Sequence, residues 1–249
     1  MDSAAVYVVL GACAGGFVQG LSGFAFGLVS MAFWAWALTP QLAAPMVVFG
    51  SLLGQILTLG TIRRGFDARR AAPFVAGGLL GMPLGVALLH HLDPVFFKLA
   101  IGGFLVVYCP AMLAAGGLPR VEAGGRAADA ASGFAGGIMG GLAGMAGPVP
   151  TLWCTLRGWG KDAQRAVFQT FNLTMHAVTL TVYAATGLID AETVGMFALV
   201  APAMLIPNLI GARLYSRVTE TTFRRLVLAL LSCTGIAMLA AALPRIVAD

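Results

Sequence analysis

The sequence predicts an all-α polytopic membrane protein made of two inverted repeats, each a broken, re-entrant helical segment followed by three spanning helices. Of the 249 residues, 59% are hydrophobic and only 10% are charged, whereas a soluble domain carries roughly a quarter of charged residues. A helix crosses the bilayer with about 20 apolar residues, so the chain has room for several crossings and short loops. The lipid bilayer is therefore the expected partner. Nucleic acid is not expected despite the net charge of +5, because basic loop residues orient a membrane protein.

Eight apolar segments follow one another along the chain. Six have the length of ordinary spanning helices: residues 42–62, 71–91, 94–116, 163–187, 192–215 and 222–244. Two longer segments, residues 6–38 and 127–156, are interrupted near the middle by small residues, at Gly20-Leu21-Ser22-Gly23 and between Gly140 and Pro148. We expect the helix to break at both interruptions, because glycine is unfavourable in a helix interior.

The two broken segments are similar to each other, which indicates an internal repeat. Gly16–Phe24 aligns with Gly137–Met145 at an offset of 121 positions. The same offset pairs polar positions further along the chain, Ser51 with Asn172 and Gln55 with His176. We therefore expect an N-terminal repeat at residues 1–117 and a C-terminal repeat at residues 118–249.

The positions of the basic residues indicate how the repeats are oriented. If each broken segment crossed the membrane once, the 15 Lys and Arg residues would divide seven to eight between the two sides. If each enters and returns on its own side, thirteen lie on one side and only Lys98 and Arg245 on the other. The positive-inside rule favours the second arrangement. Each half then has three full crossings, so the repeats are inverted and both termini lie outside.

Four short motifs occupy corresponding places in the two halves. They are Gly16–Gly27 and Gly133–Pro148 in the broken segments, and Gly81-Met82-Pro83-Leu84-Gly85 and Leu209-Ile210-Gly211-Ala212-Arg213 two segments later. These motifs resemble those of the sulfite exporter TauE/SafE family of small bacterial membrane proteins, and the resemblance covers nearly the whole chain. It implies a transporter of the bacterial cytoplasmic (inner) membrane that exports small sulfur-containing anions, such as sulfite or organosulfonates. The first motif departs from the family in Phe24 and Phe26, which stand where small residues are frequent.

The breaks are the expected place for an anion. All ten Asp and Glu residues map to loops or to the ends of the predicted segments, so a membrane-embedded carboxylate relay is not expected. Free N–H groups and the positive ends of helix dipoles can hold an anion at depth instead, and glycine lets it approach the backbone closely. The expected ligands are Ser22, Gly23, Phe24, Gly144, Met145, Ala146 and Gly147. The alternative is that these glycines only allow close helix packing.

Polar side chains on the spans after the breaks are expected to complete this site. Asn172 and His176 share one face of residues 163–187, and Ser51 and Gln55 are their counterparts on residues 42–62. Asn172 either contacts the ligand or bonds a neighbouring helix, and His176 either favours an anion when protonated or donates a single hydrogen bond. Arg213 either snorkels to the cytoplasmic face or attracts anions at the inner mouth.

Export without a coupling ion is the expected function. With the cytoplasm negative, one negative charge moving outward releases about 2.3 kcal/mol per 100 mV. A passive anion channel and a proton-coupled importer of an organic anion are the alternatives, and a homodimer stays open. An enzyme is not expected, because HExxH, GxSxG and paired carboxylates are missing from the sequence. Neither a metal nor a cofactor is expected, since the four cysteines are far apart and form no CxxC pair.

Overall fold

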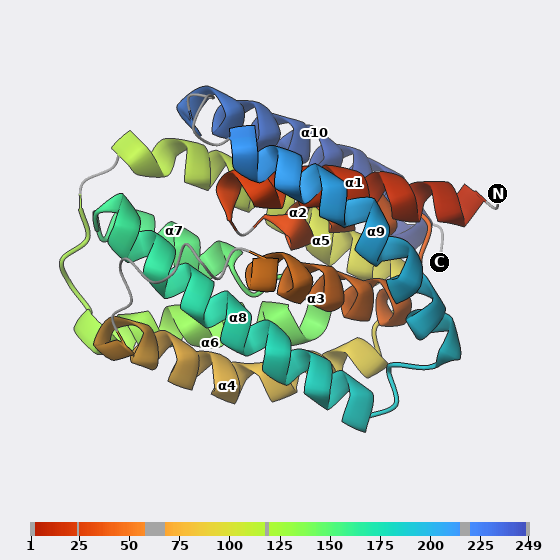
Figure 1. Cartoon of the computed structure of the whole chain (residues 1–249), viewed down its shortest axis with the longest axis horizontal. Coiled ribbons are helices and arrows are strands. Elements are labelled where there is room, and N and C mark those ends of the chain that lie inside the picture. The colour runs from red at the N-terminus through yellow and green to blue at the C-terminus, as the bar shows by residue number, and fades with distance from the viewer. Residues whose placement is uncertain (1–2, 24, 58–67, 118–119, 215–219, 248–249) are drawn as a thin grey trace.

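The computed structural model describes residues 3–23, 25–57, 68–117, 120–214 and 220–247, and the regular secondary structure in these ranges is helical, without a strand (Figure 1). The α-helices are α1 (Ser3–Ser22), α2 (Phe26–Trp34), α3 (Pro40–Leu57), α4 (Ala68–His90), α5 (Pro94–Ala114), α6 (Gly125–Ala143), α7 (Pro148–Leu156), α8 (Lys161–Ala185), α9 (Ala191–Leu214) and α10 (Glu220–Val247). A short 3-10 helix, η2 (Ala115–Gly117), follows α5. The all-α prediction is confirmed.

Five of the described helices are long and apolar enough to cross a membrane: α1, α3, α4, α5 and α9. This confirms a polytopic membrane protein, and four of the five coincide with predicted spans. The other two predicted spans differ, since α8 is too polar to qualify and α10 has only a shorter apolar stretch, Val227–Leu243. Residues 58–62 of the first predicted span lie outside the described residues.

The helix in residues 6–38 breaks as expected, between α1 and α2. The break follows a helix of 20 residues, α1, whose segment Ala4–Ser22 is itself long enough to cross a bilayer. The second broken segment begins with α6, which has 19 residues and five glycines in its last eleven positions. Arg126 and Asp129 lower the mean hydropathy of α6 further, and α6 is not among the candidate spans.

Each broken segment folds back on itself as a helical hairpin. In the first, the indole Nε1 of Trp34 donates to the carbonyl of Val8 at 3.1 Å, and Ser30 Oγ donates to that of Gly11 at 2.9 Å. In the second, Trp153 Nε1 donates to Asp129 Oδ1 at 2.7 Å. The start of each long helix thus lies beside the end of the short helix that follows it, so α2 runs antiparallel to α1 and α7 antiparallel to α6.

One glycine makes the turn in each hairpin. Gly23 and Gly144 have φ values of 84° and 67°, in the left-handed region that side chains disfavour. Their N–H groups donate back to the carbonyls of Gln19, at 2.6 Å, and Gly140, at 2.9 Å. These glycines therefore end α1 and α6 as left-handed caps, which satisfies carbonyls that the helix termini would leave open.

The most extensive contacts between helices distant in sequence are those of α1 with α9 and of α4 with α6 (Figure 1). Where these helices cross, glycines of one helix contact the backbone of the other helix. A Cβ at Gly20 would overlap the carbonyl oxygen of Asn208, and one at Gly141 would overlap that of Met82. Such small residues let helices approach closely in membranes, where packing replaces the hydrophobic effect.

The two pairs correspond residue by residue. The glycines on α1 and α6 are 121 positions apart, and the residues that they meet on α9 and α4 are 126 apart. Glycines on α9 and α4 also contact α1 and α6, since Gly211 lies against the carbonyl of Phe17 and Gly85 against that of Ile138. The same two offsets, 126 and 121 positions, relate these contacts. Each pair joins a helix from one half of the chain to a helix from the other half, and the geometry is the same.

The outer faces of the long helices are apolar. Leu80, Val107 and Ile206 have 72%, 71% and 66% of their surface exposed, on α4, α5 and α9. Exposed aliphatic side chains of this kind suit contact with lipid. Figure 1 shows that α1 begins and α10 ends at one end of the bundle, whereas α4 and α6 begin at the opposite end.

Candidate functional site

The two helix breaks meet inside the bundle. A Cβ at Gly27, in the first turn of α2, would lie 3.3 Å from the carbonyl oxygen of Gly144 and 3.4 Å from Met145 Cγ. Val47 of α3 lies against both breaks, since its Cγ1 would also contact a Cβ at Gly27 or Gly144. The beginnings of α2 and α7 are therefore brought together from segments that are far apart in the sequence.

The same hydrogen bond anchors both turning glycines. Gln55 Nε2 donates to the carbonyl of Gly23 at 3.0 Å, and His176 Nε2 lies 3.1 Å from the carbonyl oxygen of Gly144. Because a carbonyl can only accept, Nε2 of His176 carries the hydrogen. These are the residues that the sequence offset pairs, so α3 and α8 hold the two breaks in the same way.

Asn172 is a buried amide without a partner. Its side chain is 0% exposed, and neither Oδ1 nor Nδ2 forms a hydrogen bond among the described residues. It lies directly against the second break, since a Cβ at Gly147 would be 2.7 Å from Nδ2 and 2.9 Å from Oδ1. An unsatisfied buried amide costs about 1–3 kcal/mol, so its presence in a packed interior is consistent with a ligand-binding role.

The expected backbone donors divide into two groups. The N–H groups of Gly23 and Gly144 are used in the helix caps, and that of Met145 donates to the carbonyl of Met139 at 3.2 Å. The N–H groups of Ala146 and Gly147, by contrast, form no hydrogen bond among the described residues. Neither α2 nor α7 has a side-chain cap at its N-terminus. Open amides at this point therefore belong to the starts of α2 and α7 rather than to the turning glycines.

α7 offers few such amides, because prolines occupy two positions of its first turn. Pro148 and Pro150 have no N–H group, and the N–H of Thr151 donates to the carbonyl of Gly147 at 3.0 Å. Val149 is thus the one donor among the first three residues of α7. Asn172 provides a side-chain donor where the backbone of this helix is poor in donors.

The serines of the first break have internal partners. Ser22 Oγ donates to the carbonyl of Val18 at 2.8 Å and accepts from the N–H of Ala25 at 3.3 Å, so it stabilises the turn. Ser51 is buried, and its backbone carbonyl accepts a 3.0 Å hydrogen bond from Gln19 Nε2. The hydroxyl of Ser22 and the backbone carbonyl of Ser51 therefore both have partners within the protein.

Two of the expected residues are not placed at the breaks. Phe24 lies outside the described residues. Arg213 lies in the last turn of α9 with an exposed side chain, at the end of the bundle where α4 and α6 begin. It stays a candidate for the mouth of the protein.

Sequence reasoning missed several buried polar side chains near the breaks. Gln19 and Asn208 are 0% and 1% exposed, and each keeps one amide atom without a partner, Oε1 and Nδ2 respectively. Thr179, one turn beyond His176, is 1% exposed, and its hydroxyl also has no partner. The available signal was an uncharged polar residue inside an apolar segment, which is costly in a membrane and needs a reason to be there.

These features define a class: a polytopic membrane protein in which two broken helices meet at a buried polar centre, the arrangement that secondary transporters use. The family model described as Sulfite exporter TauE/SafE matches residues 7–238. The chain belongs to this family, so it is a membrane transporter and not an enzyme. No curated protein and no solved structure matches it.

Proposed function

We propose that the protein exports sulfite, or an organosulfonate of similar size, across the bacterial cytoplasmic membrane and binds it where the two breaks meet. The observation that carries this proposal is the unpartnered Asn172 amide against Gly147, beside free backbone N–H groups. Family membership supports the substrate class. An oxyanion offers several acceptors at once, which is what a cluster of unsatisfied donors needs.

The binding chemistry that we propose combines one side chain with two helix ends. Nδ2 of Asn172 donates to one oxygen of the anion, and the N–H groups of Ala146 and Gly147 donate to another. The starts of α2 and α7 add the positive ends of two helix dipoles. Several donors are required, because burying an anion without hydrogen bonds is very costly.

The proposed architecture is a pair of inverted repeats, residues 1–117 and 118–249. The shared offsets support it, since the pair α1–α9 repeats the pair α4–α6 with glycines at matching positions. The order of elements also repeats, a hairpin followed by three long helices in each half. In this arrangement the hairpins enter and return on opposite sides of the membrane, and each repeat supplies one helix to the other.

The orientation that we propose places the basic end of the bundle in the cytoplasm. Figure 1 places the starts of α4 and α6 and the ends of α7 and α9 at one end of the bundle. Basic residues gather there, as Arg69, Arg126, Arg157 and Arg213 illustrate. The positive-inside rule assigns such an end to the cytoplasm, and both termini then face outward.

Movement of one repeat against the other is the proposed transport step. The glycine-lined crossings have flat backbone surfaces with few interlocking side chains, so one helix can slide or tilt on the other. An anion bound at the breaks would then face each side in turn. The membrane potential favours outward movement of an anion by about 2.3 kcal/mol per charge at 100 mV, so no coupling ion is required.

Flux of sulfite from loaded proteoliposomes, with the potential set by a potassium gradient and valinomycin, tests this proposal. We expect saturable efflux that speeds up when the sulfite-loaded side is negative and needs no proton gradient. Efflux that does not saturate would indicate a passive channel. Uptake that depends strictly on a proton gradient, with no response to the potential alone, would indicate a proton-coupled importer and contradict the uncoupled mechanism.

A further inference from the structure

An open pocket of about 450 Å³ lies at the end of the bundle where α4 and α6 begin and α7 ends. It is lined by Arg69, Arg70, Pro73, Gly125, Arg126, Asp129, Arg157 and Trp159. The described lining thus contains four guanidinium groups and one carboxylate. About 15 residues of α6 separate Asp129 from Gly144, which corresponds to roughly 20 Å along a helix, so this pocket is distinct from the breaks.

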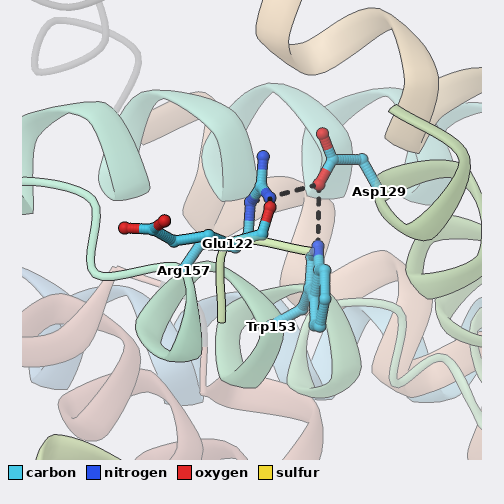
Figure 2. Close-up of polar contacts among 4 residues, drawn as sticks. All are labelled: Glu122, Asp129, Trp153 and Arg157. Atoms are coloured by element: carbon cyan, nitrogen blue, oxygen red, sulfur yellow. Dashed lines mark hydrogen bonds and ion pairs between the residues drawn. The ribbon is translucent and has the colours of Figure 1, made fainter. Parts of the chain in front are cut away.

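Asp129, the carboxylate in the described lining of the pocket, already has partners. Asp129 Oδ1 accepts from Trp153 Nε1 at 2.7 Å and lies 3.9 Å from Arg157 Nε, and its side chain is 6% exposed (Figure 2). Glu122 contributes only its backbone carbonyl, which accepts from Arg157 Nη1 at 3.1 Å, while its carboxylate points away (Figure 2). Among the described residues that line the pocket, four are arginines and one is an acid, so the described lining is predominantly basic.

Arg157 retains a donor that nothing in the described structure satisfies. Its Nε is buried and has no hydrogen-bond acceptor, because the 3.9 Å separation from Asp129 is too long for a hydrogen bond. The side chain is 17% exposed, so water reaches it poorly. A buried charged donor without an acceptor is costly, and an anion in the pocket would remove that cost.

Trp159 fixes the arginines around the pocket. The guanidinium carbons of Arg70 and Arg157 lie 5.6 Å and 5.7 Å from the centroid of its ring, and Arg157 also lies 5.9 Å from the ring of Trp153. These cation–π contacts restrict the positions of two of the four guanidinium groups, those of Arg70 and Arg157. The positive charge is therefore held in position before a ligand arrives, which lowers the entropic cost of binding.

We propose that this pocket is a second binding site, for a small oxyanion of sulfur or phosphorus, held by Arg126 and Arg157 with Arg69 and Arg70 around it. Guanidinium groups pair with two oxygens of such anions at once, which suits this class of ligand. Its role rests on the proposed function, in which the site would capture substrate at the cytoplasmic mouth. The phosphate of an anionic lipid headgroup has the same chemistry, so the source of the oxyanion must be distinguished by experiment.

Sulfate binding to the full-length protein in nanodiscs of neutral lipid tests the site by calorimetry. We expect saturable binding that weakens as sodium chloride is added, because salt screens exposed charges. Arg126→Gln and Arg157→Gln should each weaken this binding about tenfold, a loss of 1.4 kcal/mol. Lys98→Gln is the matched control, since it removes one positive charge from a cation–π contact with Trp36 at the opposite end of the bundle. Two arginine variants are used because Arg157 also donates to the backbone carbonyl of Glu122 and so contributes to the folded structure, whereas Arg126 is exposed.

A second set of nanodiscs contains phosphatidylglycerol and identifies the source. Sulfate binding that this lipid leaves unchanged assigns the site to a soluble anion, and binding that it abolishes assigns the site to a lipid phosphate. Both results support an oxyanion site. The proposal is overturned if sulfate does not bind in neutral discs, or if Lys98→Gln weakens binding as much as Arg126→Gln does.

Transport assays separate this proposal from the proposed function. If the pocket captures substrate for export, Arg126→Gln should raise KM for sulfite several-fold and leave the maximal rate near that of the wild type. A wild-type protein that binds sulfate here but moves no sulfite would contradict the proposed function and leave the site intact. Sulfite export with an unchanged KM in Arg126→Gln would overturn the capture role.

Discussion

At the first break Gln55 donates to the carbonyl of Gly23, and at the second His176 donates to that of Gly144, so the two turns are held alike. The surroundings differ. Phe26, 0% exposed, fills the position that Gly147 occupies in the second break, and its ring packs 5.9 Å from that of Trp34. The backbone scaffold is thus repeated, whereas the polar surface is concentrated in the second half.

This difference shows that two breaks with the same backbone structure need not have the same function. At the first break, Ser51 stands where the second break has Asn172, and it offers a smaller polar group. Gln19 satisfies the Ser51 carbonyl from within, whereas the Asn172 amide has no internal partner. We therefore expect the first break to be mainly structural and the second to bind the substrate.

Replacing Asn172 should have the largest effect. Asn172→Leu removes the proposed donor to the anion, and a hydrogen bond to a charged group is worth about 1.5–3 kcal/mol. We expect sulfite efflux from proteoliposomes to fall by up to about 100-fold. The protein should stay folded, because an apolar side chain of similar size leaves no unsatisfied amide behind.

Ser51→Ala is the matched change at the first break and should keep most of the efflux. Equal losses in Ser51→Ala and Asn172→Leu would contradict the unequal roles of the two breaks. Loss of folded Asn172→Leu protein, measured by gel filtration, would instead show that the amide supports the packing of α8.

Alanine at the turning glycines should lower stability at both breaks, and more at the second. A residue with a Cβ in the left-handed region costs about 1–2 kcal/mol. At Gly144 the new Cβ would also lie 2.6 Å from Val47 Cγ1, which forces α3 to shift. We expect Gly144→Ala to lose at least about 2 kcal/mol and Gly23→Ala about 1 kcal/mol. Thermal unfolding in detergent measures both, and a larger loss at Gly23 would contradict this ranking.

The two anchoring side chains should be partly interchangeable. His176→Ala removes the bond to the Gly144 carbonyl and should cost about 1 kcal/mol, whereas His176→Gln copies the first break and should restore most of that stability. Under an uncoupled mechanism, efflux by His176→Gln should also follow the same pH profile as the wild type. A pH dependence that disappears only in His176→Gln would show that the imidazole titrates during transport and would favour proton coupling.

Ser22→Ala should have the smallest effect. The change removes the 3.3 Å bond from the N–H of Ala25, and the second break already has Ala143 at the matching position. We expect a loss of about 0.5–1 kcal/mol in thermal unfolding and no change in KM for sulfite. A clear rise in KM would place Ser22 in contact with the substrate and bring the first break into the binding site.

Much of the fold could be predicted from the sequence, because the relevant signals are local. Long apolar segments indicate a membrane protein, and Gly23 and Gly144 form turns with positive φ values that residues with a Cβ disfavour. The sequence offset pairs Gln55 with His176, and the structure gives both the same hydrogen bond to a break carbonyl, a role that the sequence did not predict. The length of α1 could not be judged so well, since a sequence shows that a helix breaks more clearly than it shows how much of it can span.

The sequence predicted a site at the two breaks, and the structure brings the breaks together, but the sequence did not indicate which backbone N–H groups are open. Glycine at 144 indicated an open backbone, yet its N–H caps α6, because the conformation that makes the turn also directs this group back to Gly140. Gln19 was not predicted as a site residue, although it lies within the first glycine motif. Its contact with Ser51 joins residues 32 positions apart, which no local pattern reveals.

The sequence by itself determined that the protein lies in a membrane, where its helices break and the order in which its elements repeat. Burial in lipid and backbone strain each depend on the residues within one segment. Only the tertiary structure decided which polar groups have partners. Asn172 is unsatisfied because of what α7 and α3 place around it, and the four arginines near Trp159 face one pocket because α4, α6 and α7 meet there. Hydrogen bonds and charge excess are properties of neighbours in space, so they appear only when the helices are assembled.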